Sequence, residues 1–290
     1  DVFDLQDKVT EAVVAAIAPG VREAEMARAV AKRPESLTAY DRFLKALAKV
    51  NQARLREAIE EIDAAIEAAP GYARALALRA WLYTLQDAWV GDADLEGRAR
   101  AAGALALRAL AEAPGDVEIM AYAGYPLCFF GVEVERGMAL VRAAAERSPS
   151  FAWAWSSLGM LEMLQGSDLA FAEACADRAL RLSPRDPLAF RNLITKSRVF
   201  EETGRHAEAV EIARDGQRMR PGLAVLHVIE TRNLVVLGRM EEAREAARRL
   251  LDWIPGFRAA PFAMHHRKFR GYHWDTERFT ETLVAAGLPE

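Results

Sequence analysis

The sequence has few of the residues that interrupt helices. Its 290 residues include only 18 glycines and 12 prolines, while 52% are hydrophobic, an excess that is largely alanine. Alanine has the highest intrinsic helix propensity, and glycine and proline have the lowest. The composition therefore predicts an all-α protein with a packed core and excludes an intrinsically disordered chain.

Cysteine and long apolar runs are also scarce. Two cysteines, Cys128 and Cys175, are too few for a disulfide framework or, by themselves, for a structural zinc site. The longest uncharged stretches, 119–132 and 148–161, have 14 residues each, fewer than the roughly 20 that span a bilayer. We therefore expect a cytoplasmic protein with buried thiols and no membrane helix.

A strong basic charge is absent as well. The formal net charge is -4, which argues against a basic nucleic-acid-binding domain. Residues 1–180 carry -8 and residues 181–290 carry +4, a moderate asymmetry without a polybasic patch. We expect no contact with nucleic acid.

The familiar catalytic motifs are missing. There is no phosphate loop, no H-E-x-x-H and no G-x-S-x-G, so we expect neither a catalytic residue nor a cofactor. The stretch 265–274 contains His265, His266 and His273, but adjacent imidazoles diverge by about 100° on a helix and Asp275 is the nearest acid. A solvated basic loop is therefore favoured over a zinc site.

Prolines divide the chain into repeats. Pro70, Pro114, Pro149, Pro184, Pro221 and Pro255 each follow an alanine-rich amphipathic segment, at intervals of 44, 35, 35, 37 and 34 residues. Each interval contains two segments with apolar residues at i, i+3, i+4 and i+7, which is helical periodicity. The repeating unit is therefore predicted to be a helix hairpin, present about six times.

The clearest copy, 152–184, has the tetratricopeptide pattern. Its defining residues are Trp155, Leu158, Gly159, Ala172, Ala179 and Pro184. Small residues let the paired helices approach closely, and we expect Trp155 and Leu158 to fill the gap to the neighbouring hairpin. The predicted fold is a right-handed superhelical tetratricopeptide (TPR) solenoid with helical caps.

The repeat boundaries suggest three regions. Residues 1–33 are expected to form an N-terminal helical cap, 34–260 the repeats, and 261–290 a basic linker and a capping helix. Asp275 should cap that last helix and Gly287 should end it. The 44-residue interval contains 87–94, a turn-rich stretch that predicts a protruding loop.

Both ends of the chain resemble one bacterial family. Residues 4–14 (DLQDKVTEAVV) and 34–41 (PESLTAYD) are similar to a junction segment, and residues 277–290 (ERFTETLVAAGLPE) to the C-terminus, of multidomain regulators. These regulators carry an N-terminal class III adenylate or guanylate cyclase domain, or sometimes a winged-helix domain, followed by a TolB-like domain and TPR repeats. The resemblance implies that this chain, which begins without Met, is the non-catalytic repeat part of a longer signalling protein.

The repeat register also predicts a partner-binding groove along the first helix of each hairpin. It places there Trp81, Tyr125, Phe129, Trp153, Met160, Met163, Arg191, Arg198 and Arg232. An exposed aromatic half followed by a basic half would suit a peptide with hydrophobic anchors and an acidic end. The alternative is that these residues pack on neighbouring helices or on an upstream domain.

These observations favour a non-catalytic protein-interaction or scaffold module. The expected partners are a protein segment, the protein's own upstream domains or a second copy of the chain. Two alternatives stay open: the TPR part of a winged-helix transcriptional regulator, or a metal-dependent small-molecule enzyme that uses the histidine-rich end.

Overall fold

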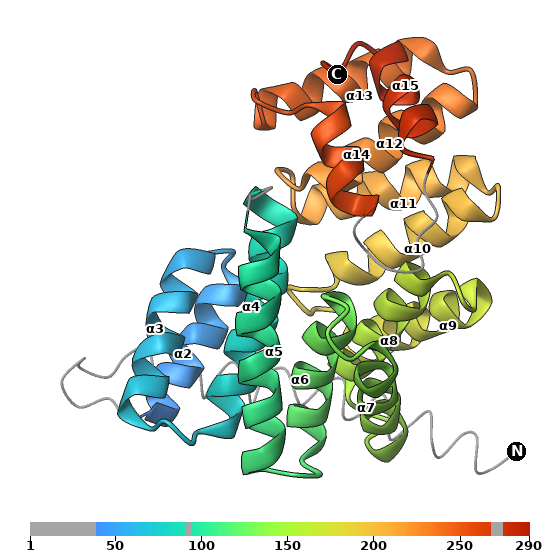
Figure 1. The fold of residues 1–290 in the computed structure, drawn as a ribbon. Coiled ribbons are helices and arrows are strands. Elements are labelled where there is room, and N and C mark those ends of the chain that lie inside the picture. The colour runs from blue at the N-terminus through green and yellow to red at the C-terminus, as the bar shows by residue number, and fades with distance from the viewer. Residues whose placement is uncertain (1–38, 91–93, 268–274) are drawn as a thin grey trace, which may run out of the picture. The chain divides into compact units, whose positions relative to one another are not determined.

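A computed structural model describes residues 39–90, 94–267 and 275–290, and these residues form fourteen helices and no strand (Figure 1). The predicted N-terminal cap at 1–33 lies outside them. The helices are α2 (Ala39–Asn51), α3 (Leu55–Ala68), α4 (Ala73–Val90), α5 (Leu95–Glu112), α6 (Val117–Phe129), α7 (Val134–Arg147), α8 (Ala152–Gln165), α9 (Leu169–Leu182), α10 (Phe190–Glu202), α11 (His206–Met219), α12 (Ala224–Val236), α13 (Met240–Trp253), α14 (Ala259–Arg267) and α15 (Thr276–Ala285).

The helices pair in chain order into hairpins, and we call the first helix of each pair the A helix and the second the B helix. A helices are even-numbered and B helices odd-numbered. The chain divides into two compact units: one runs to Leu158 and includes Arg178–Ala189, and the other comprises Gly159–Asp177 and Phe190–Glu290. Within each unit a B helix packs against its own A helix and against the next A helix, as α3 does with α2 and α4 and α11 with α10 and α12.

The prolines end the B helices as predicted, and the backbone shows why. Each lies in the turn two residues after a B helix. The residue before a proline is sterically driven out of the helical region. Five such residues share one non-helical conformation, with φ from -147° to -131° and ψ from 72° to 88°: Ala69, Ala113, Ser148, Arg220 and Ile254.

A left-handed residue makes the turn inside most hairpins. Gly131, Gly166, Gly204 and Gly238 have φ between 64° and 77°. Glycine adopts this conformation without the Cβ clash that penalises other residues. The first hairpin uses Ala53, with φ of 59°, at the same place between its helices.

Close helix crossings depend on small residues, as predicted. A Cβ at Gly159 of α8 would lie 2.9 Å from the Ala172 carbonyl oxygen of α9. Gly137 of α7 crosses α6 equally closely, since a Cβ there would lie 2.6 Å from the Gly124 carbonyl oxygen. Ala172 and Ala179 are buried, as expected of small residues within helix contacts.

Trp155 lies elsewhere than predicted. Leu158 is buried, but the Trp155 indole is only half-buried. Its Nε1 donates to the Pro149 carbonyl at 3.0 Å, and the Arg178 guanidinium lies over the ring at 4.3 Å. Trp155 therefore fastens the turn between hairpins, and the expectation that it fills the gap to the next hairpin is wrong.

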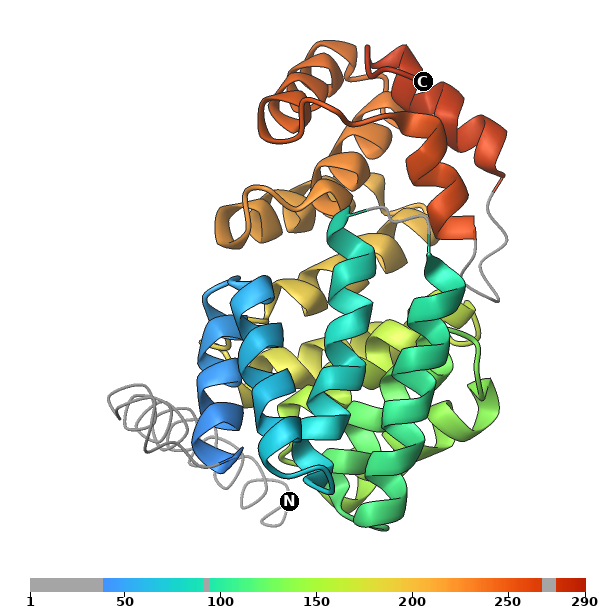
Figure 2. The same ribbon diagram turned by 60° about the vertical axis from the view of Figure 1, so that its left-hand side comes forward.

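The protruding loop predicted at 87–94 is wrong for residues 87–90, and residues 91–93 lie outside the described part of the chain. Residues 87–90 belong to α4, and α5 begins at Leu95 (Figure 2). α4 and α5 each contain 18 residues, whereas the other helices of the first six hairpins contain 13 or 14. The additional residues therefore lengthen both helices of this hairpin.

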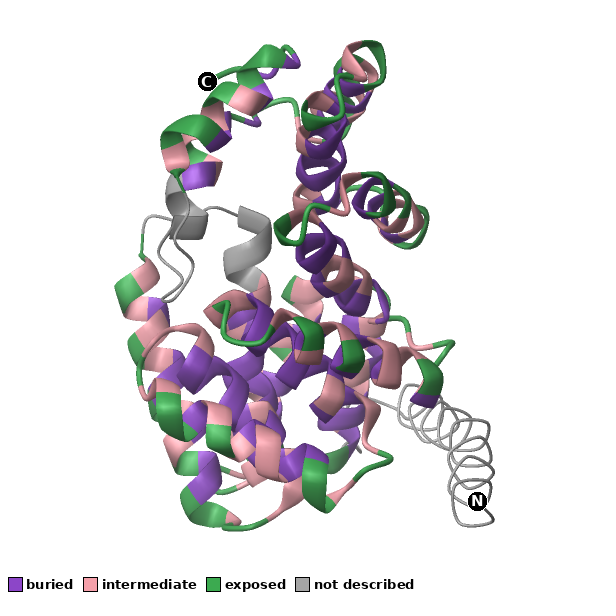
Figure 3. Cartoon of the chain, turned by 90° about the vertical axis from the view of Figure 1, so that its right-hand side faces the viewer, coloured by how far each residue is buried: buried purple, intermediate pink, exposed green. Residues whose placement is uncertain are grey.

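The last hairpin closes the second unit. As predicted, the Asp275 carboxylate caps α15 by accepting from the Arg278 N–H, and Gly287 follows the helix with φ of 93°. Phe279, Leu283 and Leu288 are buried in a cluster that includes residues of α12, α13 and α14. Figure 3 shows such buried positions running in stripes along the helices, which is the pattern of amphipathic packing.

Candidate functional site

The aromatic residues predicted for the groove form one cluster, in which Trp81, Tyr125 and Trp153 are buried and Phe129 is half-buried. The Trp81 and Trp153 rings meet edge to face at 5.7 Å, and Tyr122 stacks on Trp153 at 3.9 Å. Tyr125 meets Trp153 edge to face at 6.1 Å and stacks on Phe129 at 5.6 Å. Trp81 is 1% exposed and Trp153 is 5% exposed. The expectation of an exposed aromatic surface is therefore wrong, because these rings contact one another.

Met160 and Met163 are likewise buried. They belong to α8, and the Thr195 hydroxyl of α10 lies 3.8 Å from the Met160 sulfur. Met160 therefore contributes to the packing between α8 and α10.

The predicted basic half does not present free positive charge. Glu201 of α10 accepts from Arg198 at 2.8 Å and from Arg232 of α12 at 2.6 Å, and Phe279 lies under the Arg232 guanidinium at 4.0 Å. Arg191 and Arg198 are each 4% exposed. The expectation that these arginines receive an acidic ligand is wrong for Arg198 and Arg232, because Glu201 already pairs with both.

A small pocket on the A helices of the first unit was missed from the sequence. Its lining residues come from three successive A helices: Phe43 of α2; Arg74, Ala77 and Leu78 of α4; and Glu118, Ile119 and Tyr122 of α6. The interior is mostly apolar, because Ala77, Leu78 and Ile119 line it and are almost fully buried. Only the repeat register, which aligns positions about 40 residues apart, could have indicated it.

An ion pair forms the rim of this pocket. Arg74 Nε lies 3.2 Å from a Glu118 carboxylate oxygen, and its Nη2 lies 4.0 Å from Asp116. Asp116 also caps α6 by accepting from the Glu118 and Ile119 N–H groups, so the acidic side of the rim is fixed. At the other side, Phe43 packs edge to face on Tyr72 at 5.6 Å.

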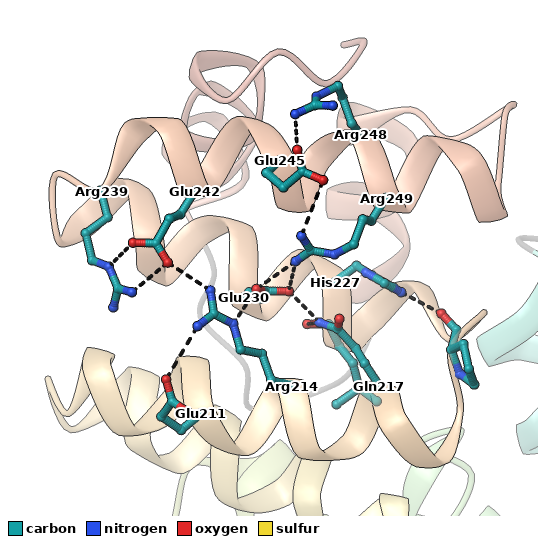
Figure 4. A network of polar contacts seen from close by, with 12 residues as sticks. Glu211, Arg214, Gln217, His227, Glu230, Arg239, Glu242, Glu245, Arg248 and Arg249 are labelled. Carbon is teal, nitrogen blue, oxygen red and sulfur yellow. Dashed lines mark hydrogen bonds and ion pairs between the residues drawn. The ribbon is translucent and has the colours of Figure 1, made fainter.

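A second polar arrangement surrounds Glu230 in the other unit (Figure 4). Its carboxylate has no exposed side-chain surface and accepts from Arg214 at 2.7 Å, Gln217 at 2.7 Å and Arg249 at 2.8 Å. These donors come from α11 and α13, on either side of α12. Burial alone would raise the pKa of Glu230, but the hydrogen bonds from Arg214 and Gln217 and the charge of Arg249 outweigh it and lower the pKa below 4.5.

His227, one turn before Glu230, is held as a neutral ring. Its Nε2 lies 2.5 Å from the Pro221 carbonyl oxygen and therefore carries the proton. Burial lowers the pKa of His227 below its ordinary value of 6.5, although the Pro221 carbonyl and Glu230 act in the opposite direction. The Glu230 carboxylate thus links helices α11, α12 and α13, and it has no exposed surface that a substrate could reach.

The described residues offer no cluster suited to metal binding. No three histidine, cysteine or acidic residues lie together there as ligands. The side chains of His265, His266 and His273 lie outside the described residues. Cys128 and Cys175 are buried thiols that form no disulfide, as predicted. None of the described helices combines the length and the apolarity needed to cross a bilayer.

Comparison with known proteins identifies the fold. No family model and no curated protein matches the chain. A thermophilic TPR protein of Thermus thermophilus is 18% identical with a TM-score of 0.52, covering 72% of this chain and 97% of that one. PilW, a widely conserved type IV pilus biogenesis factor, is 20% identical with a TM-score of 0.54, covering 76% and 94%. A chain of the APC/C hetero-tetramer Cut9–Hcn1 is 12% identical with a TM-score of 0.63, covering 95% and 47%.

At these identities the likeness concerns the fold alone. It agrees with the helix hairpins and the absence of strands in the described residues. The chain is therefore an all-α protein with the tetratricopeptide solenoid fold, and the predicted fold class is confirmed.

Proposed function

We propose that this chain is a non-catalytic protein-interaction module that binds a partner segment on the A helices of its first unit. The observation that carries the proposal is the pocket between α2, α4 and α6, which has an apolar interior and the Arg74–Glu118 ion pair at its rim. The pocket is small, so it can receive only a methyl group at the end of a partner side chain, while the rim can hydrogen-bond the partner's backbone or a flanking polar group.

The fold supports this function because stacked hairpins present an extended surface to which each repeat contributes a few side chains. The aromatic cluster of Trp81, Tyr122 and Trp153 supports it indirectly. Tyr122 belongs both to that cluster and to the pocket, so a rigid stack of rings fixes one wall of the proposed site. A preformed wall reduces the entropy that binding must overcome.

We further propose, from the resemblance at residues 4–14, 34–41 and 277–290, that the chain is the C-terminal part of a cyclase-type signalling protein and that its partner is an upstream domain of the same polypeptide. A winged-helix regulator remains the alternative parent. The residues encoded before Asp1 distinguish the two. On either proposal the purified chain should form no cyclic nucleotide from ATP or GTP with Mg²⁺ or Mn²⁺, and detectable product would contradict it.

The binding proposal is tested by titrating the upstream domain against methyl-labelled protein. We expect the Leu78 and Ile119 methyl resonances to shift, and Arg74→Ala to weaken binding about fivefold or more, as expected for loss of a rim contact worth about 1 kcal/mol. Arg100→Ala, which removes the same charge from an exposed position of α5, is the matched control. Binding that shifts neither methyl group, or that both variants weaken equally, would place the interface elsewhere.

A further inference from the structure

Three ion pairs join successive hairpins at one position of the repeat. In each pair, the ninth residue of a B helix contacts the seventh residue of the A helix that follows. The pairs are Asp63 with Arg79, Asp177 with Lys196 and Arg214 with Glu230, at nitrogen–oxygen distances of 2.7, 2.6 and 2.7 Å. Recurrence at the same two helix positions, in three hairpin contacts, distinguishes these pairs from incidental surface ion pairs.

The two members of each pair are buried unequally. The side chains on the A helix, Arg79, Lys196 and Glu230, are 11%, 17% and 0% exposed. Their partners on the B helix are 48%, 38% and 29% exposed. An A helix therefore brings a largely buried charge to the contact, and a buried charge without its counter-charge is strongly unfavourable.

The polarity of the pairs is not uniform. α3 and α9 supply an acid to the base of α4 and α10, whereas α11 supplies a base to the acid of α12. If α12 stacked on α3 or α9, Glu230 would meet a carboxylate. If α4 or α10 stacked on α11, two cations would meet. The seventh residues of α6 and α8 are Ala123 and Leu158, which carry no charge.

We propose that these charges form a stacking code that opposes the pairing of α12 with α3 or α9, and of α4 or α10 with α11, within one chain or between copies. Repeat proteins characteristically misfold by such misassembly, because every hairpin offers nearly the same apolar surface to every other. Each of these four wrong pairings leaves a largely buried charge opposite a like charge, so the code acts mainly by destabilising the alternatives.

The test compares two ways of changing the pair of Asp177 and Lys196. Reversal of one charge, Asp177→Lys or Lys196→Glu, should lower the Tm by about 5–10 °C, and the double reversal should recover most of that loss. An apolar pair, Asp177→Leu with Lys196→Met, should keep the Tm close to that of the original chain, because apolar residues often replace an ion pair without loss of stability.

Refolding separates specificity from stability. After dilution from urea at several protein concentrations, the original chain and the double reversal should return to the same oligomeric state in the same yield, measured by size exclusion with light scattering. The apolar pair should refold with a lower yield and more misassembled oligomer despite its unchanged Tm. Equal yields for the apolar pair and the original chain would overturn the proposal, as would single reversals that leave the Tm unchanged.

Discussion

Removing the buried carboxylate of Glu230 should destabilise the second unit through one well-defined contact. Three donors converge on this group, and the substitution Glu230→Ala leaves all of them without that acceptor. Arg214 keeps its contact with Glu242 at 3.1 Å. Arg249 keeps its contact with Glu245 at 3.8 Å, and Gln217 keeps its hydrogen bond to the Leu226 carbonyl at 3.3 Å. The perturbation therefore removes the shared acceptor and leaves the space that the carboxylate filled.

The magnitude follows from how buried the remaining groups are. Breaking a fully buried ion pair costs about 3–5 kcal/mol. The side chains of Arg214 and Arg249 are 29% and 38% exposed, so both can turn toward water and regain part of that cost. We expect Glu230→Ala to lower the free energy of unfolding by about 2–3 kcal/mol, and Glu230→Gln, which keeps the shape, by about 1–2 kcal/mol.

Urea unfolding followed by circular dichroism measures this loss. Glu241→Ala is the matched control, because the Glu241 side chain is 90% exposed and pairs with Arg244 of its own helix. Equal stability losses for Glu230→Ala and Glu241→Ala would refute the reasoning. Hydrogen exchange should also show the loss concentrated in α11, α12 and α13, and a loss confined to other helices would contradict the assignment.

Three further predictions use the same measurements. Gly137→Ala should cost about 2–3 kcal/mol, since the new Cβ would meet backbone atoms at 2.6 Å; a neutral result would show that α6 and α7 can move apart freely. Trp155→Ala should cost about 1–2 kcal/mol, from the lost Pro149 hydrogen bond and Arg178 contact, rather than the 3–5 kcal/mol of a core tryptophan. Folding lowers the pKa of His227 and that of Glu230, so the unfolded chain binds more protons than the folded one. The free energy of unfolding should therefore decrease as the pH is lowered, first below about 6.5 and again below 4.5. A His227→Leu variant should lose the first decline in a pH series of Tm values, and a decline that persists would assign it to another group.

The hairpins could be predicted because their boundaries are set locally. A proline disfavours the helical conformation at the residue before it, so two adjacent residues determine where each B helix ends. A different argument, from turn-rich composition, predicted a protruding loop over 87–94 and was wrong for residues 87–90. Ala88, Trp89 and Val90 continue the helix there, and the aspartate at position 94 acts as the N-cap of α5.

The site could be predicted only in part, because periodicity assigns a side chain to a face of its helix but does not determine what covers that face. Trp81 and Trp153 were correctly placed on A helices, yet 72 residues separate the two rings that bury each other. Likewise Arg232 was predicted to be available for a ligand, whereas Glu201, on a different helix, neutralises it. Contacts of this kind depend on which helices become neighbours, and that is information about the whole fold.

The seventh position of the A helix departs from the tetratricopeptide pattern in some hairpins, and these departures carry information about the neighbouring helix. Leu158 satisfies the tetratricopeptide pattern there, while Lys196 and Glu230 violate it at the same position. The two charged residues fit because the ninth residue of the preceding B helix supplies the opposite charge. Departures from the pattern are therefore correlated across helices, 16 or 19 residues apart. A charged residue at this position therefore indicates the sign of the charge on the preceding B helix, whereas the leucine of the pattern does not.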